Sequence, residues 1–84
     1  NNGASFELAK TIHTTTQTLL QPENDRPIKQ SGSSIYLLHH LGCPAVLVEC
    51  GFLSSPEEAA LLGEESYRRQ LALTLCMGIL RGIA

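Results

Sequence analysis

The chain has 84 residues, of which 43% are hydrophobic and 17% are charged, and its formal net charge is −2. This length limits it to one small domain, and the slightly acidic balance with scattered basic residues excludes the basic surface typical of nucleic-acid binding. No run reaches the roughly 18 apolar residues of a membrane span, and no basic region precedes an apolar run as in a signal peptide.

The first predicted element is a helix that begins after Ser5, a residue type that caps helices, and continues to about Leu20. The threonines at 14–16 have low helix propensity, so packing must hold this helix. The polar stretch 21–32 contains two prolines and is predicted to be a surface loop.

Two short apolar runs follow, at 35–38 and 45–48. Neither alternates between polar and apolar residues, which is typical of strands buried on both faces in a parallel sheet. The sequence therefore predicts an α/β fold.

A second helix is expected to begin at the capping box formed by Ser55, Pro56 and Glu58, and to end at Gly63. A third helix is expected from about Glu64 or Glu65 to the end of the chain. Its predicted apolar stripe consists of Leu71, Ala72, Leu75, Cys76, Ile79, Leu80 and Ile83.

The predicted order of elements is thus α-β-β-α-α. Two strands cannot bury three helices as well as their own faces. We therefore interpret the chain as the C-terminal portion of a mostly parallel sheet flanked by helices.

The stretch 44–54 carries the strongest functional signal, because Glu49 directly ends an apolar run and Gly51 follows it in a turn. In open α/β sheets, sites gather at the carboxyl ends of strands. A glutamate placed there has a desolvation cost and so has a partner charge, a metal or a catalytic task. On the residues alone, a functional Glu49 and a structural ion pair remain equally open.

The sequence Pro-Ala-Val-Leu-Val-Glu-Cys-Gly-Phe-Leu-Ser at 44–54 resembles the signature of zinc-dependent N-acetylmuramoyl-L-alanine amidases of the cell-wall and spore-cortex type. Arg26 and Lys29 are similar to the family's basic loop, and the flanking matches cover essentially the whole chain. The resemblance implies a bacterial enzyme with a mostly parallel sheet flanked by helices. Residues 1–84 would then be the C-terminal segment of the catalytic domain, without its N-terminal zinc-ligand half.

The family's zinc is held by two histidines and a glutamate, all before the helix that opens this chain. The resemblance implies that Glu49 is the catalytic general base and acid, that this chain contributes no metal ligand, and that alone it is inactive. The implied reaction hydrolyses the amide between N-acetylmuramic acid and L-alanine in peptidoglycan, as in autolysins and sporulation hydrolases. The enzyme would act outside the cytoplasm, and the chain would self-associate through an uncovered sheet edge. The alternative is a non-catalytic, amidase-like module that binds wall material or a protein partner.

Other candidate residues favour simpler interpretations. His13 is more consistent with a surface histidine than with a zinc ligand, and the neighbours His39 and His40 point to opposite sides of a strand end. The three cysteines show no C-x-x-C spacing, and Cys50 is expected to be a small buried residue rather than a nucleophile.

The basic residues of the predicted loop leave two interpretations open. Arg26 and Lys29 could bind a substrate carboxylate or glycan, or could belong to a solvated loop.

Overall fold

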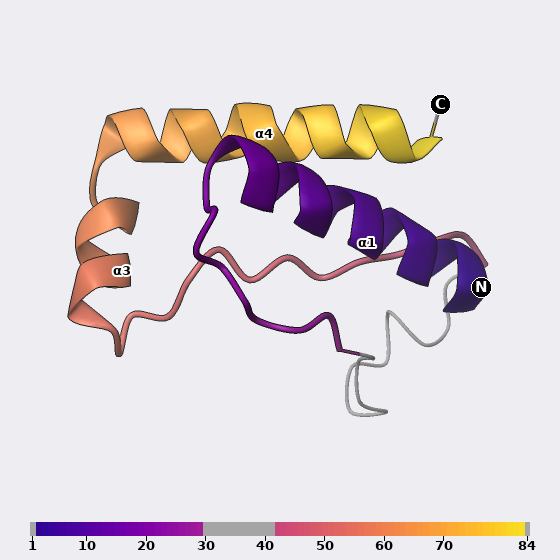
Figure 1. The fold of residues 1–84 in the computed structure, drawn as a ribbon, viewed down its shortest axis with the longest axis horizontal. Coiled ribbons are helices and arrows are strands. Elements are labelled where there is room, and N and C mark those ends of the chain that lie inside the picture. The colour runs from indigo at the N-terminus through magenta and orange to yellow at the C-terminus, as the bar shows by residue number, and fades with distance from the viewer. Residues whose placement is uncertain (1, 30–41, 84) are drawn as a thin grey trace.

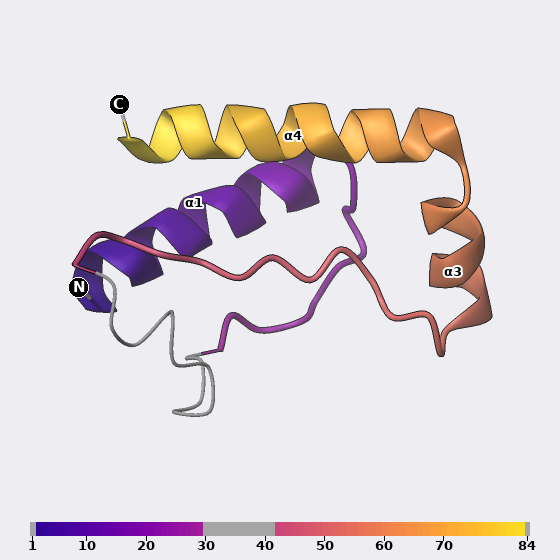
Figure 2. The same cartoon turned by 180° about the vertical axis from the view of Figure 1, so that it is seen from behind.

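The structure is a computed structural model that describes residues 2–29 and 42–83. This part of the chain forms three helices, α1 (Asn2–Leu19), α3 (Pro56–Leu62) and α4 (Glu65–Ile83). Helices α1 and α4 pack against each other, and α3 contacts α4. The connecting segments 20–29 and 42–55 lie on the side of α1 away from α4 (Figures 1 and 2).

The predicted α/β fold is wrong for the described residues, which are all helical and contain no strand. The run 45–48 is extended, but the Ala45 N–H donates to the Ser5 hydroxyl at 3.0 Å rather than to a neighbouring strand. Leu47 and Val48 are 58% and 41% exposed instead of buried on both faces. An extended segment becomes a strand only where another strand pairs with it, and none does so here. The other predicted strand, 35–38, lies outside the described residues.

Because the described residues form no strand, two further predictions are also wrong for this part of the chain. The order α-β-β-α-α is replaced by three helices, and the described part of the chain has no sheet edge through which copies could associate.

Helix α1 begins earlier than the sequence suggested. It starts at Asn2, so Ser5 lies inside the helix and holds the segment that begins near Ala45 instead of capping the helix. Two of the three low-propensity threonines are held by packing as expected, since Thr15 and Thr16 are 0% and 8% exposed, whereas Thr14 is exposed. The Thr16 hydroxyl also donates to the carbonyl of Ile12, one turn earlier, at 2.8 Å.

The core of the structure lies between α1 and α4. Ile12 and Leu71 are its buried apolar side chains, at 7% and 6% exposure. Gly78 lets the helix backbones approach closely, because a Cβ there would lie 3.0 Å from the Ile12 Cα. At the same crossing, the Arg81 guanidinium donates to the Thr15 hydroxyl at 3.1 Å.

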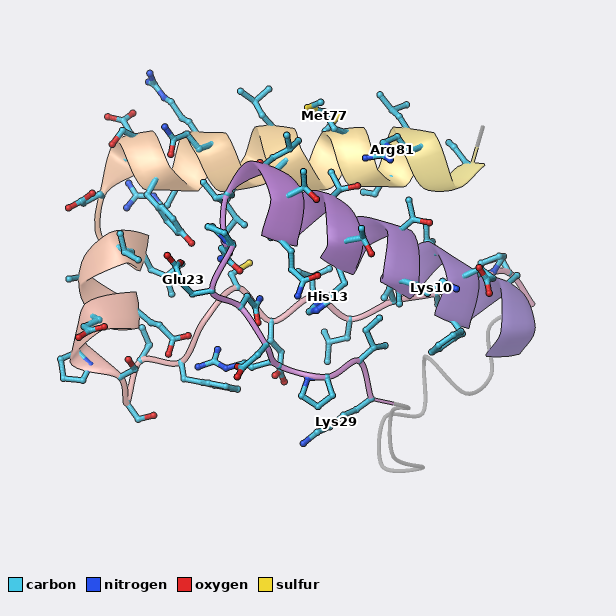
Figure 3. All side chains as sticks on the ribbon, viewed as in Figure 1. Lys10, His13, Glu23, Lys29, Met77 and Arg81 are labelled. Carbon is cyan, nitrogen blue, oxygen red and sulfur yellow. The ribbon has the colours of Figure 1, made fainter. Side chains whose placement is uncertain are left out.

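The predicted apolar stripe of α4 is only partly buried. The buried residues of the helix are Leu71, Thr74 and Gly78. Large apolar side chains elsewhere on α4 are exposed: Leu73, Met77, Ile79, Leu80 and Ile83. Figure 3 shows Met77 on the edge of α4 away from α1. Within residues 2–29 and 42–83, no helix has the length and apolar character needed to cross a membrane.

Helix α3 matches its prediction closely. Ser55 is the N-cap, with its hydroxyl accepting from the Glu58 N–H at 3.4 Å, and Pro56 occupies the first helical position. Gly63 caps the other end, donating its N–H to the carbonyls of Ala59 and Ala60. Only half of the capping box forms, because the Ser55 N–H donates to the Phe52 carbonyl at 3.0 Å.

Candidate functional site

Glu49 lies near the end of an extended segment that runs from the N-terminal end of α1 to α3 (Figure 2). The hydrogen bond from Ala45 to Ser5 holds the start of this segment on α1. The Glu49 side chain is exposed and belongs to none of the three ion pairs found among the described residues. This disfavours a structural ion pair as the reason for a glutamate at this position.

A cavity of about 730 Å³ lies between α1 and the two connecting segments, and Glu49 lines it. Ile12 and Leu71 contribute to its apolar wall, whereas Asn24 and Arg26 contribute polar groups. His13 also faces this cavity, projecting from the side of α1 that is turned away from α4 (Figure 3). The exposed carboxylate therefore borders a space with both apolar and hydrogen-bonding walls, as ligand sites generally have.

The loop that reaches this cavity is held by side-chain amides. Gln17 on α1 donates to the Asn24 carbonyl at 2.5 Å, and Asn24 donates to the side chain of Gln21 at 2.9 Å. Gln21 in turn donates to the Tyr67 hydroxyl on α4 at 2.7 Å. The loop is thus fixed to both long helices before the chain reaches Arg26.

Arg26 connects the loop to the turn that follows Glu49. Its two terminal nitrogens donate to the two carboxylate oxygens of Glu58 at 2.6 and 2.8 Å. Its guanidinium carbon lies 4.6 Å from the centroid of the Phe52 ring, within the range of a cation–π interaction. We refer to Arg26, Phe52 and Glu58 as the Arg26 clamp.

The electrostatics of the Arg26 clamp follow from this geometry. The hydrogen bonds from Arg26 lower the pKa of Glu58 to about 2, and the Ser55 hydroxyl and the Phe52 backbone also favour the ionised carboxylate. The same hydrogen bonds raise the pKa of Arg26, and the charges of Asp25 and Glu49 act in the same direction.

Gly51 forms the turn between Glu49 and the clamp. Its φ of +156° lies in a region that side-chain-bearing residues rarely adopt. A Cβ at this position would also lie 3.3 Å from the Leu62 Cδ1 and 3.4 Å from the Glu58 Cβ. The turn after Glu49 thus packs directly on α3, and its backbone conformation favours glycine.

The described residues do not fit a zinc site. Across 2–29 and 42–83, no group of three His, Cys, Asp or Glu side chains could hold a metal ion. His13 is half-buried on the cavity wall without such companions, and His39 and His40 lie outside the described residues.

The cysteine predictions are partly wrong. Cys43, Cys50 and Cys76 are free, consistent with the absence of a disulfide framework, but all three are exposed. Cys50 therefore does not serve as a small buried residue.

Sequence reasoning singled out Glu49 but missed the clamp beside it. The sequence predicts Glu58 as part of a helix cap, and it leaves Arg26 open between a residue that binds substrate and one in a solvated loop. The two lie 32 positions apart, and a single sequence gives no local signal for such a pair.

Comparison with known proteins identifies the class of molecule. The family model for N-acetylmuramoyl-L-alanine amidase matches residues 1–81, and the chain belongs to this family.

Two relatives illustrate the similarity. The chain is 47% identical over 47 residues to the germination-specific N-acetylmuramoyl-L-alanine amidase of Bacillus subtilis (strain 168), a match that covers 56% of this chain and 20% of that protein. It is 52% identical over 40 residues to the N-acetylmuramoyl-L-alanine amidase AmiC of Neisseria meningitidis serogroup B, covering 48% of this chain and 10% of that protein. The match thus spans a fifth or less of the length of these relatives. No solved structure matches the chain significantly.

Proposed function

We propose that this chain is part of a peptidoglycan hydrolase that cleaves the amide between N-acetylmuramic acid and L-alanine, with Glu49 as the general base and acid. The observation that carries the proposal is the exposed Glu49 carboxylate on a mixed polar and apolar cavity, outside every ion pair of the described residues. Membership of the amidase family supports the reaction class.

In the proposed reaction, the oxygen of the attacking water bonds to the amide carbon while the Glu49 carboxylate takes a proton from that water. The carbon–nitrogen bond then breaks, and the same carboxyl group returns the proton to the leaving amine of L-alanine. The products are a carboxylic acid on the muramic acid side and a free α-amino group on the peptide. Glu49 needs no covalent intermediate for this role, only access to water and to the amide.

Zinc is part of the proposal for the complete enzyme only. Bound zinc polarises carbonyls and acidifies water, but the described residues offer no group that fits it. We therefore propose that residues 1–84 are the C-terminal segment of a larger catalytic domain whose other residues hold the metal. The limited share of each relative that the match spans is consistent with this arrangement. We refer to the protein with that domain intact as the complete amidase.

The proposed place of action is outside the cytoplasm, at the cell wall or the spore cortex, where peptidoglycan is found. One matching relative is named as germination-specific, which supports a role in spores as one version of the proposal. The other version is an autolytic role in wall turnover. Comparing the rate of hydrolysis of spore-cortex peptidoglycan with that of vegetative-wall peptidoglycan distinguishes the two versions.

The test is product analysis with the complete amidase and its Glu49→Gln variant. Glutamine keeps the size of the side chain but cannot accept the proton, so the release of free L-alanine amino groups from peptidoglycan should fall about 10²–10⁴-fold. An unchanged rate in the variant would remove Glu49 from the mechanism. If neither protein releases amino groups but both bind peptidoglycan, the chain belongs to a non-catalytic, wall-binding module instead.

Self-association of the isolated chain is a further part of the proposal. The exposed apolar side chains of α4 include Leu73, Met77, Leu80 and Ile83, and monomeric proteins rarely expose large contiguous apolar patches. Sedimentation of the isolated chain should therefore show dimers or larger species. A monomer at all accessible concentrations would contradict it.

A further inference from the structure

The backbone that follows Glu49 is held by contacts with α3 and with Arg26. Glu49 is exposed, and only two residues separate it from Phe52. Gly51 packs on Leu62 and Glu58, so this turn rests on α3. The next residue, Phe52, is held by the Arg26 clamp, in which the guanidinium lies over its ring.

The clamp bridges three parts of the chain. The Arg26 backbone N–H donates to the Asn24 side chain at 3.0 Å, which connects it to the amide network on α1 and α4. Its guanidinium holds Glu58 on α3 through two parallel bonds, a bidentate geometry that fixes orientation as well as distance. Arg26 thus connects the loop that is fixed to the long helices with the turn after Glu49.

The Arg26 guanidinium is already bound to other residues of the protein. Both terminal nitrogens of Arg26 bond to Glu58, and one face lies over Phe52. This disfavours the interpretation in which Arg26 binds a substrate carboxylate. The side chain is also about half exposed, and exposed ion pairs contribute little to stability.

We propose that Arg26 is a positioning residue for the amidase reaction: by clamping Phe52 and Glu58 it orients the Glu49 carboxylate toward the amide. This inference rests on the proposed function of Glu49. A misplacement of about 1 Å can cost about 10²-fold in rate, so a residue that touches no substrate can still control turnover.

The experiment uses the complete amidase with a soluble muropeptide, so that kcat and KM are both defined. Arg26→Gln should lower kcat about 10–100-fold and leave KM within about twofold, because positioning affects the reaction step and not substrate binding. Arg26→Lys should have a kcat between those of Arg26→Gln and the wild type, since lysine keeps the charge but not the paired donors.

Arg69→Gln is the matched control. Arg69 also pairs with a glutamate at 2.8 Å, Glu65, but on the exposed surface of α4. Its kcat should stay within about twofold of the wild type. An equal loss of kcat in both variants, or no loss in Arg26→Gln, would overturn the inference.

Two double variants complete the design. In a Glu49→Gln background, Arg26→Gln should cause no further loss, because groups that act as a unit are not additive. An additional 10-fold loss in that background would mean that Arg26 acts independently of Glu49. The double variant that exchanges the two charges, Arg26→Glu with Glu58→Arg, should have a kcat at least tenfold higher than either single variant. A double variant with native helix content that does not recover kcat in this way would also overturn the inference.

The two proposals fail in distinguishable ways. If Glu49→Gln keeps full turnover, the proposed function is wrong. If Glu49→Gln is inactive while Arg26→Gln is fully active, only the positioning role is wrong. Circular dichroism of each variant normalises turnover to folded protein, and the charge swap remains decisive even if Arg26→Gln unfolds.

Discussion

The helix pair and the Glu49 segment are held in different ways. Helices α1 and α4 bury Ile12 and Leu71 and approach closely at Gly78. The Glu49 segment is largely exposed and is attached at a few points, notably Ser5 at its start and the Arg26 clamp at its end. The difference teaches that the fold and the proposed chemistry depend on different kinds of contact, close packing for the helix pair and a few directional contacts for the Glu49 segment.

Removing a core side chain should break the helix pair. Leu71→Ala is expected to lower the free energy of unfolding by about 2–5 kcal/mol, because it deletes buried methyl groups and leaves a cavity. Urea denaturation followed by circular dichroism measures the loss. The control is Leu73→Ala, the same change at a 67% exposed position of the same helix, which should stay within about 0.5 kcal/mol of the wild type. Equal effects would show that α1 does not cover α4 at Leu71.

Filling the space at the helix crossing should have a smaller effect. Alanine is favoured over glycine in helices by about 1 kcal/mol, but at position 78 its Cβ would lie 3.0 Å from the Ile12 backbone. Overpacking costs about 1–3 kcal/mol, so Gly78→Ala should destabilise the chain by about 1 kcal/mol net. Gly42→Ala, where a Cβ meets nothing within 4 Å, is the reference. A Gly78→Ala chain more stable than the wild type would place the helices further apart than described.

The Arg26 clamp should make a small, pH-dependent contribution to stability. The pKa of Glu58 is lowered from 4.5 to about 2 in the folded chain, chiefly by the Arg26 hydrogen bonds. A lowered carboxyl pKa stabilises the fold fully above the unfolded value of 4.5, and this stabilisation is lost as the pH falls toward 2. The melting temperature of the wild type should therefore drop more steeply than that of Glu58→Gln between pH 5.5 and about 2. Parallel curves would mean that the pair does not form in solution.

Metal binding should be the smallest effect of all. The part of the chain that the structure describes has no group of three suitable ligands, and zinc sites need three or four arranged donors. Equilibrium dialysis of the 84-residue chain should therefore find no stoichiometric, tightly held zinc, and His13→Ala should not change the result. One zinc per chain would contradict this and would direct attention to His13, His39 and His40.

The sequence predicts local features of this molecule better than distant ones. Helix α3 was correctly expected because Ser55, Pro56 and Gly63 act within one or two turns of the backbone. The strand at 45–48 was wrongly expected, because an apolar run specifies burial but not the neighbouring strand that must pair with it.

The candidate site follows the same rule. Glu49 could be identified from the residues adjacent to it, whereas the contact of Arg26 with Glu58 joins positions 32 apart. The buried side of α4 could be predicted only in part: Leu71 and Leu80 both belong to the predicted apolar stripe, but Leu71 is 6% and Leu80 58% exposed, because only Leu71 packs within the described core.

The most direct test of this difference between fold and proposed chemistry compares Glu49→Gln and Gly78→Ala in the complete amidase, measuring melting temperature and turnover per folded molecule for each. We expect Glu49→Gln to melt within about 2 °C of the wild type, as an exposed substitution should, and to lose about 10²–10⁴-fold in turnover. Gly78→Ala, at a contact between α1 and α4 that does not line the cavity, should melt a few degrees lower and retain most of its turnover per folded molecule. A Glu49→Gln protein that loses stability but keeps its turnover would contradict the account and make Glu49 a structural residue.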